Sequence, residues 1–127
     1  MTTHYLPNAY GIVAYVKAAT DTTTLGVTDS QVELEAPVTK MTSTPSGLNA
    51  PAAISTSVLG FTPEYGEPSF NPTGLPCVFS SGTCENHGFT YYFHDNRPQG
   101  QVGWSAISIS PAGRLKKWYW NGSSWID

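Results

Sequence analysis

The sequence has little charge and no long apolar run. Only 12% of its 127 residues are charged, and the formal net charge is −3 at pH 7. An acidic balance gives no overall positive field for a phosphate backbone, so broad nucleic-acid affinity is disfavoured. No apolar run reaches the roughly 20 residues that a membrane-spanning helix needs, and no leader-like segment precedes the first expected strand. The 13 Ser and 15 Thr predict a hydroxyl-rich surface on a single domain, residues 1–127.

Cysteine is also scarce. Cys77 and Cys84 are the only two, and Ser80, Ser81 and Gly82 lie between them in a loop that a disulfide can close. Their spacing matches neither a metal-ligand pattern nor a redox pair, which favours a structural bridge over two unpaired thiols. In the chain-entropy model such a short ring stabilises a fold by about 2 to 3 kcal/mol. A bridge predicts a location outside the cytoplasm.

Catalytic motifs are missing. The sequence contains no nucleophile elbow, zinc-protease helix, phosphate loop or dinucleotide glycine motif. His87 and His94, with Glu85 nearby, allow a metal site to be imagined, but a loop and a strand face explain them more simply. We therefore expect no enzyme activity, no catalytic residue, no metal and no cofactor.

The N-terminal half predicts short, scattered elements. Tyr10–Val16 is β-branched and aromatic, and Gln31–Glu35 alternates apolar with charged residues, so both are expected strands. Pro51–Val58 allows only a brief helix. Four prolines between Thr62 and Pro76 predict an extended loop with a short edge strand at Ser69–Asn71.

The C-terminal half has clearer patterns. Phe89–His94 alternates with period two, as a strand does. In the run Gln101–Ser110 the apolar phase flips near Ala106, which indicates a bulge or burial of both faces. Ser110–Gly113 has the residue preferences of a type I turn, and a further strand begins at Arg114.

Asn121-Gly122 is the strongest turn signal, because this pair supplies the two positive φ angles of a type I′ hairpin. The register that follows pairs Trp118 with Trp125 and Lys116 with Asp127. Everything after Gly88 is then a four-stranded antiparallel meander. The predicted fold is mainly β, with an irregular and stranded part at 1–68, an antiparallel meander at 69–127 and at most a short helix.

Two surfaces are candidate binding sites. The four tryptophans could stack on a sugar, although core or interface packing is the simpler interpretation. Gly113–Lys117 is the only cationic cluster. Arg114 and Lys116 project from one strand face and Lys117 from the other, so at most two charges act together on a phosphate.

The stretch Ser108–Trp125 (SISPAGRLKKWYWNGSSW) resembles the C-terminal end of type IV pilin and minor pseudopilin globular domains, of the type II secretion H-type or FimT-like class. In that family a strand ends in S-P-x-G-R, and some members finish with a W-x-G-S-S-W hairpin. Phe70–Pro76 (FNPTGLP) and the strand that begins at Gly88 resemble the same family. The resemblance covers about residues 69–127 and implies a pilin-like β head.

The N-terminal part departs from the family, whose members carry a long apolar helix in the filament core. Residues 1–40 contain no such helix. Either the helix was trimmed from this chain or another chain supplies it, as in the split, two-chain pilins of Geobacter-like bacteria, and we favour the second arrangement. The expected partners are a short helical pilin chain and like subunits in a helical filament, with membrane contact only through the helical chain.

We therefore expect a structural subunit of an extracellular pilus or secretion pseudopilus, on the surface of a Gram-negative cell and periplasmic before assembly. The predicted partner interface consists of apolar residues outside the expected meander: Tyr5, Tyr10, Ile12, Leu59 and Phe61. The alternatives are a FimT-like DNA-binding head, through Arg114, Lys116 and Lys117, and a carbohydrate-binding module that uses the tryptophans.

Overall fold

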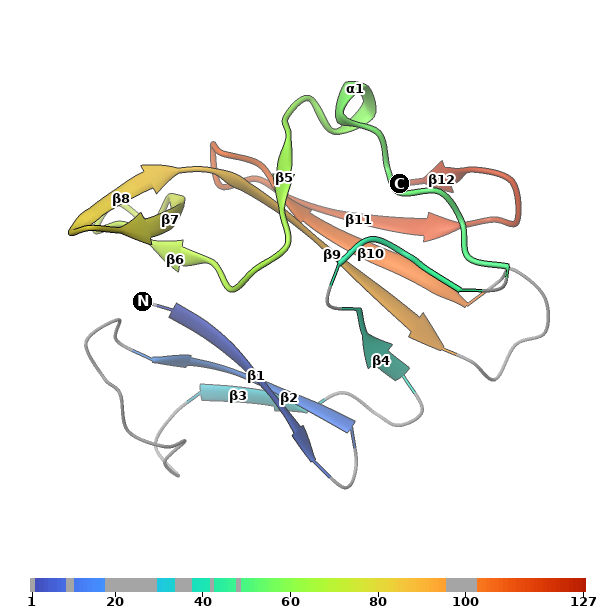
Figure 1. Ribbon diagram of the computed structural model, residues 1–127, viewed down its shortest axis with the longest axis horizontal. Coiled ribbons are helices and arrows are strands. Elements are labelled where there is room, and N and C mark those ends of the chain that lie inside the picture. Colours follow the sequence, from blue (N-terminus) through green and yellow to red (C-terminus); the bar gives the residue numbers. More distant parts are fainter. Residues whose placement is uncertain are drawn as a thin grey trace.

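The computed structural model describes residues 2–8, 11–17, 30–33, 38–41, 43–47, 49–95 and 103–127. Their fold is mainly β, as predicted, and no described helix reaches seven residues. The strands form two sheets (Figure 1). Within these ranges, no helix is long and apolar enough to cross a membrane.

The first sheet has the order β3-β2-β1-β6-β7-β8. Its N-terminal strands are β1 (Thr2–Asn8), β2 (Gly11–Lys17) and β3 (Ser30–Glu33), and all pair antiparallel. Both strands predicted in this region are therefore present, with small shifts of their bounds. A single residue pair, Thr2 with Ser69, joins β1 to β6 (Ser69–Phe70), the predicted short edge strand.

The hairpin of β7 (Pro76–Ser80) and β8 (Thr83–Asn86) completes this sheet. Ser80 pairs with Thr83, so its loop is only Ser81-Gly82, and φ is 50° at Ser81 and 81° at Gly82. Two positive φ angles in a two-residue loop are the signature of a type I′ turn. The sequence predicts only a loop in this segment, because serine is unusual at positive φ.

The second sheet has the order β12-β11-β10-β9-β4, and β5 (Pro63–Glu64) pairs with β9 in parallel. Its strands are β4 (Val38–Lys40), β9 (Gly88–Asp95), β10 (Trp104–Ile109), β11 (Leu115–Trp120) and β12 (Trp125–Ile126). The predicted four-stranded meander after Gly88 is confirmed. Residues 96–102, which include the first two residues of the run Gln101–Ser110, lie outside the described residues.

The phase change in β10 has a simple cause. Register with β9 is unbroken from Trp104–His94 to Ile109–Phe89, so no bulge interrupts the strand. Trp104, Ala106 and Ser108 are buried on one face, whereas Ile107 and Ile109 are half-buried on the other. Burial on both faces, one of the two interpretations of the sequence, is therefore correct.

The turn between β10 and β11 follows its prediction. Gly113 N–H donates to Ser110 O at 2.8 Å, and Ser110 N–H donates to Arg114 O at 2.9 Å. Gly113 has a φ of 79°. A type I turn followed by a left-handed glycine is the usual three-residue hairpin connection.

The predicted register of the last hairpin is wrong. Trp120 pairs with Trp125 and Tyr119 with Ile126, so the loop has four residues rather than two. Asn121 Oδ1 accepts the backbone N–H groups of Ser123 and Ser124 at 2.9 and 2.8 Å. This side chain holds the wider loop, and only Gly122 in it has a positive φ, 98°. Trp118 therefore does not pair with Trp125, and Lys116 is not directly opposite Asp127.

The main apolar cluster lies on one face of the second sheet. Tyr92, Ala106 and Trp118 pack there against Ile54. Ile54 belongs to residues 49–65, which we call the covering segment; it runs across this face and contains α1 (Thr56–Leu59) (Figure 1).

The helix is shorter than the predicted 51–58 because residues before Thr56 form tertiary hydrogen bonds in an extended conformation. Ile54 N–H donates to Tyr92 Oη at 2.9 Å, and Trp125 Nε1 donates to Ala52 O at 2.8 Å. Both backbone groups therefore bond to side chains of the sheet rather than to a helical turn.

Candidate functional site

The cationic residues lie where strand alternation puts them. Arg114, Lys116 and Trp118 share the core face of the second sheet, and Lys117 lies on the opposite face with Leu115 and Tyr119. The three cations predicted as a possible DNA-binding group are thus divided between two surfaces, as expected from the sequence.

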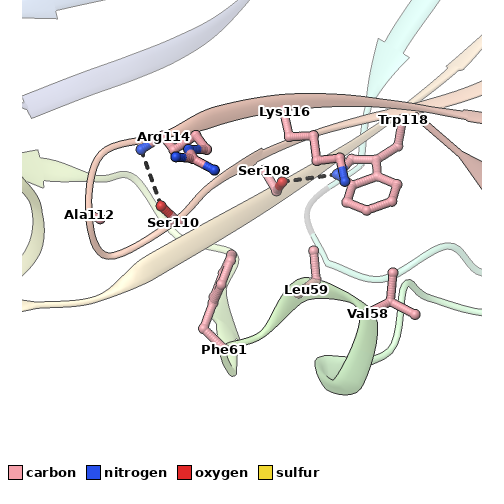
Figure 2. A pocket seen from close by; sticks show the side chains of 9 residues that line it. All are labelled: Val58, Leu59, Phe61, Ser108, Ser110, Ala112, Arg114, Lys116 and Trp118. Atoms are coloured by element: carbon pink, nitrogen blue, oxygen red, sulfur yellow. Dashed lines mark hydrogen bonds between the residues drawn. The ribbon is translucent and has the colours of Figure 1, made fainter.

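Arg114 and Lys116 line a groove between the β10–β11 hairpin and the covering segment (Figure 2). We call it the Arg114 groove. Its volume is about 370 Å³, and the opposite wall consists of Val58, Leu59 and Phe61. Two hydrogen bonds shape the β side: Trp118 Nε1 donates to Ser108 Oγ at 2.9 Å, and Arg114 N–H donates to Ser110 Oγ at 3.1 Å.

Lys116 already has two neighbours. Its ammonium lies 2.7 Å from Asp127 Oδ2 and 4.2 Å from the centroid of the Trp118 ring. Hydrogen bonding to Lys116, followed by its positive charge, lowers the pKa of the exposed Asp127 carboxyl. Asp127 thus offsets the charge of one of the two groove cations, which weakens the case for a DNA phosphate track here.

The tryptophans do not form one exposed platform. Trp104 and Trp118 are buried, and Trp104 stacks on His94 with ring centroids 4.1 Å apart. Trp120 and Trp125 are partly buried and meet edge to face at 5.6 Å. Within the described ranges, the buried indole nitrogen of Trp120 has no hydrogen-bond partner. Sugar stacking could therefore use at most the last two rings.

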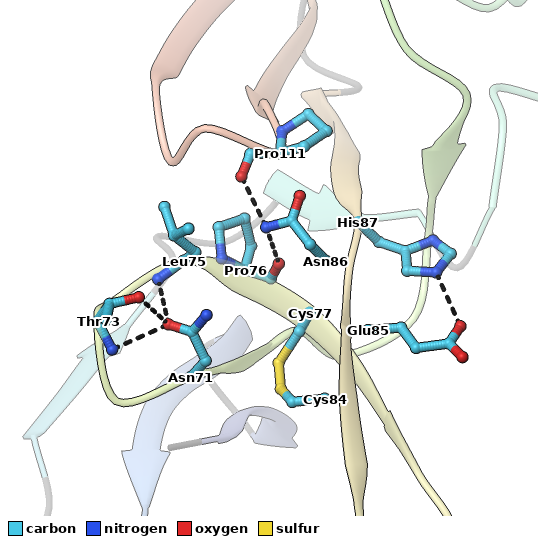
Figure 3. The surroundings of a disulfide bond; sticks show 10 residues. All are labelled: Asn71, Thr73, Leu75, Pro76, Cys77, Cys84, Glu85, Asn86, His87 and Pro111. Atoms are coloured by element: carbon cyan, nitrogen blue, oxygen red, sulfur yellow. Dashed lines mark hydrogen bonds and ion pairs between the residues drawn. A yellow bond between two sulfur atoms is a disulfide. The ribbon is translucent and has the colours of Figure 1, made fainter.

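Cys77 and Cys84 form the predicted disulfide, which links β7 to β8 (Figure 3). Their Cα atoms are 5.3 Å apart, within the range for disulfides, and Cys77 is fully buried. The hairpin is also tied to the meander, because Asn86 Nδ2 donates to Pro111 O at 2.8 Å. The bridge therefore holds a hairpin that contacts the β10–β11 turn.

The imagined histidine site is not assembled. His87 Nδ1 lies 3.2 Å from Glu64 Oε1, and Nε2 lies 3.7 Å from Glu85 Oε2. His94 instead stacks on Trp104. Among the residues that the structure describes, no group of three or more His, Cys, Asp or Glu side chains is placed to hold a metal ion.

The other face of the meander carries apolar side chains, several of which are exposed. We call it the open face and define it by Phe93, Ile107, Ile109, Leu115, Lys117, Tyr119 and Ile126. Leu115, Tyr119 and Ile126 are 68%, 53% and 46% exposed. A hollow of about 130 Å³ lies between Phe93, Ile107, Lys117 and Tyr119. The sequence signal for this surface was the i, i+2, i+4 series Leu115, Lys117, Tyr119, which was not used to predict the partner interface.

The predicted interface residues fall into two groups. Leu59 packs against the core, and the Phe61 ring lies so close to Gly88 that a Cβ there would overlap it. Both side chains thus also serve the chain's own fold. Tyr5 and Ile12 lie in β1 and β2, Tyr10 lies outside the described residues, and their interface role stays a prediction.

Comparison with known proteins gives no relative: no family model, no curated protein and no solved structure matches the chain.

Proposed function

We propose that this chain is a non-enzymatic structural subunit of an extracellular type IV pilus or pseudopilus. It forms the β-rich outer head and pairs with a helical pilin chain. The observation that carries the proposal is the open face, an apolar sheet surface that is exposed at its β11–β12 end in the described part of the chain.

The first argument is the alternation of the strands. A sheet with one solvated face alternates apolar and polar residues, whereas β10 has apolar residues on both faces. Leu115, Tyr119 and Ile126 extend this second apolar face across β11 and β12. Exposed apolar surface of this continuity is typical of an interaction site.

The second argument concerns the occupant. Lys117 lies within the open face, opposite Ile107 and on the same strand face as Tyr119. An amphipathic helix that brings an apolar stripe and one acidic side chain would cover the face and pair this cation. The pilin resemblance implies such a helix, and the proposal assigns it to a separate pilin chain.

The proposal accounts for two further features. The disulfide keeps the β7–β8 hairpin closed in an oxidising environment, which agrees with an extracellular head. Only 12% of the residues are charged, so association with like subunits would depend on apolar and hydroxyl contacts rather than on charge.

The test is incorporation into filaments sheared from the native cells. Leu115→Asp with Tyr119→Asp puts two charges on the open face and should remove the chain from the filament fraction. Phe79→Asp is the matched control, since Phe79 is 57% exposed on the β7–β8 hairpin, away from the open face. It should incorporate normally.

Near-ultraviolet circular dichroism and thermal unfolding of the secreted variants check that the heads fold. Absence of the unaltered chain from sheared filaments contradicts the proposal. So does normal incorporation of the doubly charged variant.

A further inference from the structure

The Arg114 groove lies on the opposite side of the meander from the open face, so its occupant does not depend on the proposed function. It is formed where the covering segment leaves the β10–β11 end of the core face uncovered (Figure 2). Its volume of about 370 Å³ falls at the lower end of the range for small-ligand sites.

The polar lining of the groove consists of cations and hydroxyl groups, and none of its lining residues is acidic. In the part of the chain that the structure describes, the Arg114 guanidinium has no ion-pair partner. Ser108 and Ser110 accept hydrogen bonds from Trp118 Nε1 and Arg114 N–H, so their hydroxyl hydrogens can donate to another group. Such a donor set suits an anion.

The remaining wall is apolar. Val58, Leu59 and Phe61 face the cations across the groove, as Figure 2 shows. An inorganic ion would leave this wall in contact with water, whereas a ligand with an apolar body would cover it. The wall therefore selects an anionic group attached to an apolar group.

Asp127 shows that a carboxylate binds one of the groove cations in this chain. Its carboxylate already binds Lys116 at 2.7 Å, at the rim of the groove. A bound anion would share Lys116 with Asp127, whereas no other described anion would compete with it for Arg114.

We propose that the Arg114 groove binds a small organic anion, a carboxylate or phosphate carried on an apolar body. Arg114 is the main charge contact, Lys116 is shared with Asp127, and Val58, Leu59 and Phe61 hold the apolar part.

The experiment titrates the protein with 2-naphthoate, 2-naphthyl phosphate and the uncharged 2-naphthamide in phosphate-free buffer. The Trp118 indole N–H resonance reports binding, because that group lines the groove and bonds to Ser108. At least one of the two anions should bind about tenfold or more tightly than the amide, since a charge-assisted hydrogen bond is lost with the amide.

Three variants locate the site. Arg114→Gln should weaken anion binding about tenfold. Lys117→Gln removes the same charge on the other face of the same strand and should change binding little. Asp127→Asn releases Lys116 and should tighten binding several-fold.

Equal affinity for the amide and both anions would overturn the proposal, because the groove would then be only apolar. Equal loss in Arg114→Gln and Lys117→Gln would overturn it as well, because net charge rather than the groove would explain the binding. No gain in Asp127→Asn would exclude Lys116 and reject the site as described. Duplex DNA that binds through Arg114 while the naphthyl anions do not would reject a small-ligand site.

Discussion

The two faces of the β9–β12 meander are both rich in apolar side chains, yet they have different surroundings. On the core face, Tyr92, Ala106 and Trp118 are buried beneath the covering segment. On the open face, Leu115 and Tyr119 of the same strand as Trp118 are more than half exposed. Adjacent residues of one strand thus lie in two different environments. This difference in exposure indicates that a cover for the open face comes from outside the described residues.

Several polar groups of the core face bond to specific partners, although among the described residues the buried Thr90 Oγ1 and Trp120 Nε1 have none. Tyr92 Oη accepts the N–H of Ile54, and Trp118 and Trp125 donate their indole N–H groups to Ser108 and Ala52. The bonds of Ile54 and Ala52 hold the covering segment against the sheet, and loss of the buried bond between Ile54 and Tyr92 would leave a polar group without its partner. On the open face, the Lys117 ammonium and the Tyr119 hydroxyl are polar groups that could form such bonds with a cover.

The open face is itself divided. Toward β9, Phe89 and Tyr91 are buried, and Tyr91 Oη donates to Gly66 O at 2.9 Å. Toward β11 and β12 the side chains are exposed. The segment at Gly66 therefore contacts the β9 end of this face, whereas the β11–β12 end stays exposed among the described residues.

The largest expected effect comes from a pair of adjacent substitutions, Trp118→Ala and Tyr119→Ala. Trp118 is 4% exposed and Tyr119 is 53% exposed. Truncation of a buried tryptophan costs about 3 to 5 kcal/mol, whereas an exposed site costs about 0.5 kcal/mol. Urea unfolding at pH 7 measures both free energies of unfolding. Similar losses for the two variants would show that the faces are not different environments for the isolated chain.

Loss of the disulfide is expected to have the next largest effect. Cys77→Ala with Cys84→Ala should lower the free energy of unfolding by about 2 to 3 kcal/mol, from loop-closure entropy in the unfolded chain. The test compares urea unfolding with and without reductant. Reductant should destabilise the unaltered protein and leave the double variant unchanged. If reductant has no effect on the unaltered protein, the bridge does not hold the β7–β8 hairpin.

The sequence predicted the meander well because its information is local. Strand alternation in Phe89–His94 and the Pro-Gly turn after Ser110 depend on neighbouring residues alone. The register predicted from Asn121-Gly122 is wrong because this residue pair occurs in two kinds of turn. Its asparagine either adopts a positive φ or accepts hydrogen bonds through its side chain, and only the second occurs here.

The candidate sites were predicted less completely. Spacing alone placed Arg114 and Lys116 on one face and Lys117 on the other. The apolar wall of the Arg114 groove was not predictable, because Leu59 and Phe61 are about fifty positions away along the chain and no local pattern brings them there. The short helix was misplaced for the same reason, since Ile54 bonds to Tyr92 across the core.

Alkaline pH should weaken the core face through Tyr92. Burial raises the pKa of Tyr92 to about 12; the hydrogen bond from Ile54 opposes the rise and Tyr65 adds to it. An unfolded tyrosine ionises near pH 10, so the stabilisation is complete below pH 10 and is lost as the pH rises toward 12. A rise of two units in the pKa of Tyr92 corresponds to about 2 to 3 kcal/mol in the free energy of unfolding.

The measurement is the free energy of unfolding in urea at pH 9, 10, 11 and 12. Tyr92→Phe serves as the control, because it keeps the ring and removes the titrating group. The variant should lose stability less steeply above pH 10, and what slope remains belongs to other groups such as Tyr65, whose pKa is also raised by burial. Parallel curves for the two proteins would contradict the role of Tyr92.

The smallest expected effect is at the exposed pair of Lys116 and Asp127. Their hydrogen bond lowers the pKa of Asp127, so its stabilising contribution is present above the pKa of an unfolded aspartate and is lost as the pH falls through the lower, folded value. Because both groups are exposed, the effect on stability is small, and the direct measurement is the carboxyl pKa by nuclear magnetic resonance. Lys116→Gln should raise that pKa, whereas Lys117→Gln, one position along but on the open face, should leave it nearly unchanged. Equal shifts in the two variants would mean that the general charge of the strand, rather than the contact across the β11–β12 hairpin, sets the carboxyl's titration. The Arg114 groove would then lack the shared carboxylate that the anion proposal assigns to its rim.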